Sequence, residues 1–363
     1  MKEKFKTIKV SGDININLGD KGIWEADKET LLYHIKEVCE EYHGLGYTLT
    51  LRQMYYQLVS KDLIPNHDKV YKKLGKLKDD LLYGGYVDWD IFVDRGRVPY
   101  IAYTEHNIKG ALQRTVNSYN LNKQLNQETH LEVWTEKDAI SGIIKRAVNP
   151  YTVRVVVNKG YTSSTAIYDS YQRFLDIIQK GQKVVILYFG DHDPSGLDMI
   201  RDIRDRVMNF FLNGDGIAQL NGHIVDWASS DEIMDEVEQL SEEDEELFDS
   251  YVKEDKNGSA FQWVRYFFDK HFEVVPIGLT MEQIEKYNPP PNPAKMTDPR
   301  SKPYIKKFGN VSWEVDALRP EVMTDIVQTK ILEYMDYETY QDVLDREKIE
   351  IAELQDMVDN INK

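Results

Sequence analysis

Three acidic residues follow two apolar segments that we predict to be parallel strands, and these acids are the first candidates for chemistry. Glu136 comes directly after residues 130–135. Asp191 and Asp193 come shortly after residues 183–189. In open α/β sheets the ligand crevice lies beyond the carboxyl ends of the strands. No cysteine or HxxH pattern is nearby in the sequence, so the carboxylates predict a hard oxygen site for Mg²⁺, with Mn²⁺ as the alternative ion.

A competing interpretation is that acids in such loops cap the helices that follow them. Asp193 or Ser195 would suit an N-cap ahead of the helix expected from residue 197. For one acid we favour capping, whereas for three acids on two βα turns we favour the metal site. His192, between the two aspartates, either positions a water or is an exposed polar loop residue.

The elements that must position these acids form a predicted α/β domain over residues 130–280. Near-continuous apolar strands that alternate with helices predict a parallel, Rossmann-like sheet covered on both faces. The strands are expected at 130–135, 152–157, 183–189 and 272–277, and the helices at 138–148, 165–178 and 197–211.

An acidic segment at about 229–257 interrupts this domain. The whole chain has 45 Lys plus Arg against 62 Asp plus Glu, a net charge of −17, which excludes a simple polybasic binder. Between Asp231 and Lys256 stand thirteen acids and two bases, so most of the excess charge belongs to this one segment. We interpret it as a solvated face or an insertion, with a docking surface as the alternative. The overall charge therefore does not argue against a DNA partner.

An N-terminal winged helix is predicted at residues 29–100, after a polar arm or hairpin at 1–28. Three amphipathic helices are expected, at 29–41, 51–61 and 68–83, and Thr50 with Gln53 is a capping-box signature for the second. An alternating stretch, Tyr86 to Val93, is expected to form a strand or wing. Three helices followed by a wing are typical of a winged helix-turn-helix.

Basic residues supply the candidate DNA contacts. Four lysines line one face of the third helix, and two arginines close the wing. Two more lysines lie near strand ends, where either would neutralise a scissile phosphate. A solvated helix face and ordinary strand-end charges are the alternatives. The candidates are Lys69, Lys72, Lys73, Lys76, Arg95, Arg97, Lys137 and Lys159.

The remaining segments are a linker at 101–129 and a C-terminal segment at 281–363, which combines a rigid proline connector with a helical stretch from 320 to 360. No run approaches the roughly 20 apolar residues of a membrane helix, so no membrane partner is expected. The single cysteine, Cys39, agrees with a reducing compartment. We therefore expect a cytoplasmic protein, associated with the nucleoid if it is bacterial or phage-encoded.

The motifs around the acids resemble a TOPRIM domain, the metal-binding fold of topoisomerases, primases and some nucleases. They read Val-Trp-Thr-Glu136-Lys-Asp-Ala, Asn-Lys-Gly160-Tyr and Leu-Tyr-Phe-Gly-Asp191-His-Asp193-Pro-Ser-Gly. More narrowly, the chain is similar to the topoisomerase VI A subunit and the meiotic double-strand-break transesterase. Leu51-Arg52-Gln-Met-Tyr55-Tyr56 resembles the Arg-x-x-Tyr-Tyr segment of that family, and Trp313-Glu314-Val-Asp-Ala-Leu318 resembles its C-terminal segment. The resemblance covers about residues 48–332.

This resemblance implies a Mg²⁺-dependent enzyme that cleaves double-stranded DNA. Glu136, Asp191 and Asp193 would hold the metal, with Glu136 also catalytic, and Tyr56 would attack a phosphodiester to leave a 5′-phosphotyrosyl link. In the family the tyrosine of one subunit meets the metal of the other, which implies a homodimer. A topoisomerase would also need a separate ATPase subunit, because this chain has no GxxxxGK[ST] pattern.

Helical spacing bears on the two tyrosines. Tyr55 belongs to the apolar stripe of its helix, whereas Tyr56 shares a face with Arg52, whose guanidinium would hold a phosphate and favour the phenolate. The alternative is that Tyr56 packs at the edge of the core, as most tyrosines on amphipathic helices do.

Two other functions stay open. TOPRIM nucleases, including the nuclease subunit of the Wadjet plasmid-defence system, resemble the same architecture but cleave by water attack, and Tyr56 would then be structural. A non-catalytic DNA-binding or assembly module is the third hypothesis, with the acidic segment as a docking surface or DNA mimic.

Overall fold

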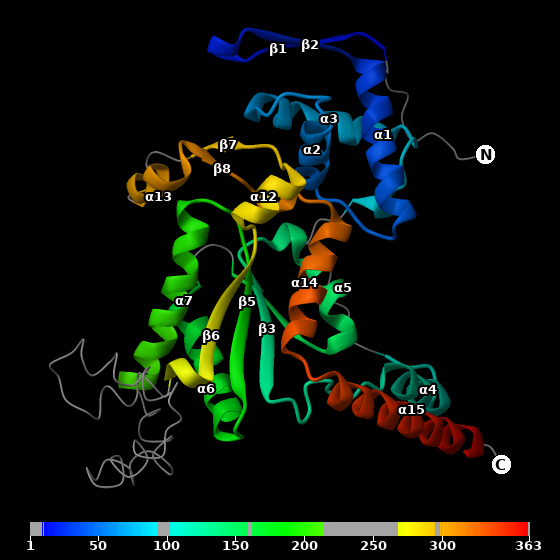
Figure 1. Cartoon of the computed structure of the whole chain (residues 1–363). Coiled ribbons are helices and arrows are strands. Elements are labelled where there is room, and N and C mark those ends of the chain that lie inside the picture. Colours follow the sequence, from blue (N-terminus) through cyan, green and yellow to red (C-terminus); the bar gives the residue numbers. More distant parts are fainter. Residues whose placement is uncertain are drawn as a thin grey trace, which may run out of the picture.

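The computed structural model describes residues 11–92, 104–158, 162–213, 268–294 and 300–361, together with Lys9, Ala102 and Asp298. Over these residues the chain is a mixed α/β protein with a parallel sheet at its centre (Figure 1). The N-terminal helices lie beyond the carboxyl ends of the strands, and α4 (Ile108–Ser118) and α15 (Tyr337–Asn360) project from the body near the C-terminus (Figure 1). No helix in the described part of the chain is long and apolar enough to cross a membrane.

The central sheet has four parallel strands in the order β4-β3-β5-β6. The strands are β3 (Thr129–Thr135), β4 (Arg154–Val157), β5 (Lys183–Phe189) and β6 (Phe272–Gly278), within two residues of the predicted bounds. After β4 the chain crosses back over β3 to form β5, so the strand order reverses between β3 and β5. Such a reversal opens a crevice at the carboxyl ends of the two strands, where open α/β sheets bind ligands.

Helices cover both faces of this sheet, which explains why its strands are almost continuously apolar. On one face, Leu131, Val133, Val185 and Leu187 pack against α5 (Ser141–Val148) and α14 (Pro320–Tyr334). On the other face, Trp134, Val184, Ile186 and Tyr188 pack against α6 (Ser164–Gln179) and α7 (Pro194–Asn213). The prediction of a doubly covered parallel sheet is confirmed.

The N-terminal unit begins with a hairpin and continues with three helices that share one core. The hairpin is β1 (Asp13–Asn17) and β2 (Ile23–Asp27), and the helices are α1 (Lys28–Gly44), α2 (Leu51–Ser60) and α3 (Asp68–Tyr83). The capping box of Thr50 and Gln53 at the start of α2 is present as predicted. Its reciprocal hydrogen bonds satisfy backbone groups that the first turn of a helix leaves unpaired.

The predicted wing is not a strand in the part that the structure describes. Residues 86–92 hold a short 3₁₀ turn, Trp89–Ile91, and Phe92 forms a single bridge with Leu49. Among the described residues this stretch has no strand beside it apart from that bridge, and Trp89 is half exposed. The wing arginines, Arg95 and Arg97, lie outside the described residues, as do Lys159 and the acidic segment at 229–257.

Two further expectations differ from the structure. The predicted linker at 101–129 contains helix α4 (Ile108–Ser118), which packs against α15 (Tyr337–Asn360). The predicted helix at 320–360 is instead α14 followed by α15. The break comes where Asp336 leaves the helical conformation and its carboxylate accepts a hydrogen bond from the Thr339 amide, which caps α15.

After β6 the chain returns over the carboxyl edge of the sheet. This return includes α12 (Met281–Tyr287), the short strands β7 (Asn292–Pro293) and β8 (Val311–Ser312), α13 (Ser301–Phe308) and the 3₁₀ turn Val315–Ala317. β7 and β8 pair antiparallel, so the predicted proline connector ends in a strand. His192 and Trp313 exchange two backbone hydrogen bonds, of 2.9 and 3.1 Å, which hold the return against the loop after β5.

Candidate active site at the carboxyl edge of the sheet

Two of the predicted acids follow β3 and β5 at the carboxyl edge of the sheet. Glu136 is half-buried and Asp191 is buried. Asp191 Oδ1 accepts a hydrogen bond of 2.7 Å from the Val315 amide and lies 2.8 Å from Lys137 Nζ. The returning segment therefore fixes one oxygen of Asp191.

Lys137 lies at the centre of a cluster of carboxylates. Its ammonium is 2.8 Å from an oxygen of each of Asp191, Glu314 and Asp316. Burial alone would lower the pKa of Lys137, but the three negative charges outweigh it and raise the pKa well above its ordinary value. Only 13% of the side chain is exposed, and Lys137, a predicted phosphate contact, faces acids of its own chain.

Arg52 joins this cluster from helix α2. It forms an ion pair with Glu314, and its Nε lies 3.3 Å from Asp316 Oδ2. Burial favours the neutral form of Glu314, but the charges of Lys137 and Arg52 prevail and lower the pKa of Glu314 to about 2. Glu314 and Asp316 thus connect the N-terminal helices to the edge of the sheet.

Tyr56 reaches the same cluster through an asparagine. Asn292 Nδ2 donates to Tyr56 Oη at 3.3 Å and lies 3.4 Å from Glu314 Oε1. Asn66 in turn donates to Asn292 Oδ1, and its own Oδ1 accepts a hydrogen bond of 2.7 Å from Tyr55 Oη. All these contacts lie within one chain.

The environment of Tyr56 disfavours the phenolate. The side chain is 4% exposed, and burial is the largest cause of a raised pKa, with Glu314 adding to it. The Asn292 hydrogen bond and Arg52 act in the opposite direction but do not prevail. Arg52 lies 5.8 Å from the centre of the Tyr56 ring, so the two residues share a face of α2 as predicted. The predicted effect of Arg52, to favour the phenolate, is outweighed by burial and by the charge of Glu314.

Asp193 has the capping geometry of the competing interpretation. Its Oδ1 accepts a hydrogen bond of 2.7 Å from the Gly196 amide in the first turn of α7. A side chain at Gly196 would place its Cβ 2.2 Å from the Asp191 carbonyl oxygen, so only glycine fits this turn. Capping uses one carboxylate oxygen and is compatible with metal binding through the other.

His192 is not the exposed polar loop residue that was one of its two predicted alternatives. It is 3% exposed, and its Nδ1 lies 2.9 Å from the hydroxyl of Tyr304, which donates to the His192 carbonyl at 2.8 Å. Burial lowers the pKa of His192. The imidazole therefore packs beneath the returning segment, against the rings of Tyr304, Phe308 and Trp313.

The predicted metal ligands do not form a closed site. Within the residues that the structure describes, no group of three or more His, Cys, Asp or Glu side chains is gathered as a metal-binding cluster. Their chemistry nevertheless fits Mg²⁺, which takes oxygen ligands. The pKa of Asp191 is raised to about 7, with burial as the largest cause. The charge of Lys137 lowers this pKa, whereas the charges of Asp316, Glu136 and Glu314 raise it further. A bound cation would relieve this excess of negative charge.

The lysines of α3 lie apart from this cluster. Lys69, Lys72 and Lys76 are exposed and Lys73 is half-buried. Lys69 Nζ donates to the Asn17 carbonyl oxygen at 2.6 Å, which ties the hairpin to the helix. The structure leaves most of this face open to solvent, and its role in DNA binding stays a prediction.

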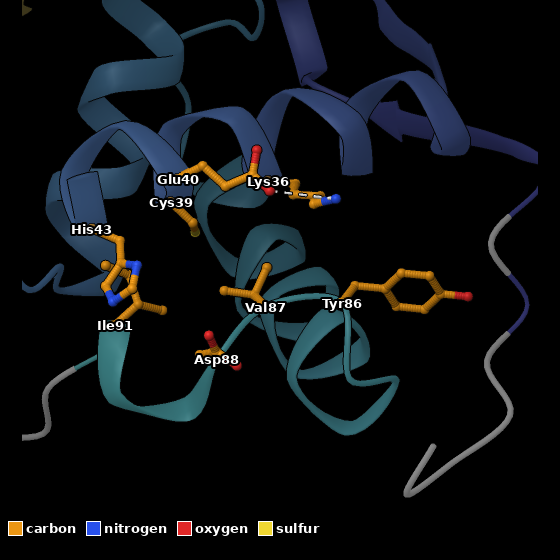
Figure 2. Close-up of a pocket in the computed structure, with 8 residues that line it drawn as sticks. All are labelled: Lys36, Cys39, Glu40, His43, Tyr86, Val87, Asp88 and Ile91. Atoms are coloured by element: carbon orange, nitrogen blue, oxygen red, sulfur yellow. Dashed lines mark ion pairs between the residues drawn. The ribbon is translucent and has the colours of Figure 1, made fainter. Parts of the chain in front are cut away.

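A separate pocket of about 200 Å³ lies between α1 and residues 86–91 (Figure 2). Lys36 and Glu40 form an ion pair of 3.4 Å at its rim, and burial raises the pKa of Cys39 in its wall to about 12. Its volume is below the roughly 300–1,000 Å³ of typical ligand sites. No predicted site residue lines it, so the candidate active site remains the edge of the sheet.

Several residues of the cluster carried no predicted role. Glu314 and Asp316 belong to the motif Trp313-Glu314-Val-Asp-Ala-Leu318, so this motif was the feature of the sequence that could have pointed to them. Asn66 and Asn292 are 226 positions apart, and nothing in the sequence connects them.

Comparison with protein-family models gives no match, and comparison with curated proteins gives none. The resemblance to TOPRIM proteins therefore rests on the motifs and on the edge of the parallel sheet to which they belong.

Proposed function

We propose that this protein is a metal-dependent enzyme that cleaves double-stranded DNA, with Tyr56 as the nucleophile. The observation that carries the proposal is the contact chain from Tyr56 through Asn292 and Glu314 to Lys137 and Asp191. It joins the Arg-x-x-Tyr-Tyr segment to the acidic edge of the sheet, although the two are far apart in the sequence.

Glu136, Asp191 and Asp193 would hold Mg²⁺ or Mn²⁺ in this proposal. The ion would stabilise negative charge on the scissile phosphate and its leaving oxygen. The two βα turns deliver the three side chains to the switch point of the sheet, the expected place for a ligand. Lys137 would keep the neighbouring carboxylates from repelling one another before the ion binds.

In the cleavage step, Tyr56 Oη forms a bond to phosphorus as the bond to the 3′-oxygen breaks. The phenol loses a proton and the 3′-oxygen gains one, which leaves a 5′-phosphotyrosyl link and a free 3′-hydroxyl. Arg52, on the same helix, would bind the phosphate through its guanidinium once it exchanges Glu314 for that anion. Asn292 would orient the phenol. A winged-helix grip on DNA and a separate ATPase subunit belong to the same proposal. The homodimer is proposed from the family resemblance alone, because the contacts between Tyr56 and the acids lie within one chain.

A nuclease that uses water as the nucleophile is the second candidate. The burial of Tyr56 and its raised pKa favour it, because both oppose a role as an attacking phenolate. In that case Tyr56 would have a structural role, packing between the N-terminal helices and the edge of the sheet.

The two candidates separate in a DNA-nicking experiment. Supercoiled DNA is incubated with the protein and Mg²⁺, quenched with detergent and analysed with and without protease. We expect protein-linked 5′ ends that disappear in Tyr56→Phe and in Asp191→Ala but persist in Tyr33→Phe, a control at an exposed tyrosine of α1. Cleavage that survives Tyr56→Phe and is lost in Asp191→Ala identifies the nuclease. No cleavage under any condition would contradict both and leave a non-catalytic DNA-binding or assembly module.

A further inference from the structure

Tyr188, near the end of β5, carries a buried hydroxyl that no role described so far explains. The side chain is 2% exposed, and within the described residues its hydroxyl has no hydrogen-bond partner. Buried hydroxyls are almost always paired, because an unpaired one has lost its hydrogen bonds to water. A phenylalanine would fill the same space without that cost.

The hydroxyl of Tyr188 lies at the acidic edge of the sheet, not deep in the core. A Cβ added at Gly190 would lie 2.8 Å from it, so the hydroxyl touches the turn that leads to Asp191. In the sheet, Tyr188 pairs with Trp134, two residues before Glu136. Its own strand leads to Asp191, and the strand beside it, β3, leads to Glu136.

The electrostatics agree with this position. Burial raises the pKa of Tyr188, and the next causes are the charges of Glu136, Asp191 and Asp193, in that order. All three predicted ligands thus act on one phenol. The hydroxyl is a hydrogen-bond donor, and it lies at the turn that leads to one of these carboxylates, Asp191.

We propose that Tyr188 is a positioning residue of the metal site, whose hydroxyl donates a hydrogen bond to a ligand carboxylate when the acids gather around the ion. Outer-shell hydrogen bonds of this kind orient the ligands of many metal sites. This inference rests on the proposed function, because it assumes that Glu136, Asp191 and Asp193 bind the ion.

The test is Tyr188→Phe, studied by Mn²⁺ and Mg²⁺ calorimetry without DNA and by thermal unfolding without metal. We expect about tenfold weaker ion binding, the lower end of the range for outer-shell partners. We also expect an unchanged or higher unfolding midpoint, because the ring stays and an unpaired hydroxyl is removed. Tyr171→Phe, a buried tyrosine of the same core cluster, is the matched control and should bind the ions as the unaltered protein does.

Each other outcome is decisive. Equal ion affinity in Tyr188→Phe and in the unaltered protein would overturn the inference and leave the proposed function intact. A lower unfolding midpoint or a failure to fold would show that the hydroxyl is structural. If the unaltered protein binds neither ion, the metal-dependent function fails, and this inference fails with it.

Discussion

Replacing Lys137 by methionine decides whether this lysine is a DNA contact or the counter-ion of the acid cluster. The sequence predicts the first role, whereas the structure surrounds the ammonium with three carboxylate oxygens at 2.8 Å each. Asp316 is fully buried and Asp191 nearly so. Without Lys137, Arg52 would still pair with Glu314 and Asp316, whereas Asp191 would lose its cationic partner among the described residues.

The expected loss of stability follows from that geometry. Removing one partner of a buried ion pair typically costs about 3–5 kcal/mol, because the other charge is left uncompensated. Glu314 and Arg52 are partly exposed, at 21% and 47%, so water will screen part of the uncompensated negative charge. We therefore expect about 3 kcal/mol, or roughly 6 °C in the unfolding midpoint at about 2 °C per kcal/mol for a large domain.

The assay is thermal and urea unfolding at neutral pH, alongside DNA binding at several salt concentrations. Lys145→Met, at an exposed lysine of α5, is the control and should change stability by no more than about 0.5 kcal/mol. Adding Asp316→Asn to Lys137→Met should cost less than the sum of the two single changes, because it removes one of the unpaired charges. Suppose instead that stability is unaltered and that the slope of log binding constant against log salt concentration falls by about 1. Lys137 would then be a phosphate contact and not the counter-ion of the acid cluster.

Two further substitutions test the sheet and the turn beside the site. Glu132→Gln should destabilise the protein by about 2–3 kcal/mol at pH 7, because Glu132 is fully buried and Arg173, its partner at 2.6 Å, is partly exposed. Burial favours the neutral acid, but hydrogen bonds and the charge of Arg173 prevail and lower the pKa of Glu132. The ionised carboxylate therefore contributes fully to the stability of the fold above the ordinary pKa of glutamate, and this contribution is lost as the pH falls below that value. The difference between the two proteins in urea unfolding should therefore shrink below about pH 4, and a gap that widens there would contradict the assignment. Gly196→Ala should cost about 1–3 kcal/mol and abolish Mn²⁺ binding in calorimetry, because the new Cβ would lie 2.2 Å from the Asp191 carbonyl. Gly75→Ala, where the nearest atom would be 3.5 Å away, is the matched control; equal effects of the two would show that the turn has no special requirement.

Local patterns predicted most of the secondary structure. The strands of the sheet are apolar on both faces, and Thr50 with Gln53 marks the start of α2, so pattern and structure agree. Where a pattern depends on a distant partner it fails. Residues 86–92 alternate like a strand, but their strand-like pairing within the described residues is a single bridge between Phe92 and Leu49.

The candidate site was predictable to the level of the sheet edge. Strand ends place Glu136 and Asp191 together because parallel strands share one carboxyl edge. The sequence does not reveal that Lys137 faces acids or that Asn66 and Asn292 meet, because these contacts depend on how the returning segment crosses the edge. The spacing that puts Arg52 beside Tyr56 also says nothing of burial, which dominates the pKa of that phenol.

A covalent bond between DNA and Tyr56 would be direct evidence that this tyrosine is the nucleophile. The protein is incubated with duplex DNA and Mg²⁺, quenched with detergent, digested with nuclease and protease, and examined by mass spectrometry. We expect a peptide in which Tyr56 carries a 5′-linked nucleotide, and we expect the Asp191→Ala protein to lack this modified peptide. Cleaved DNA with free 5′-phosphates, no adduct on any tyrosine and full activity of Tyr56→Phe would contradict this role of Tyr56.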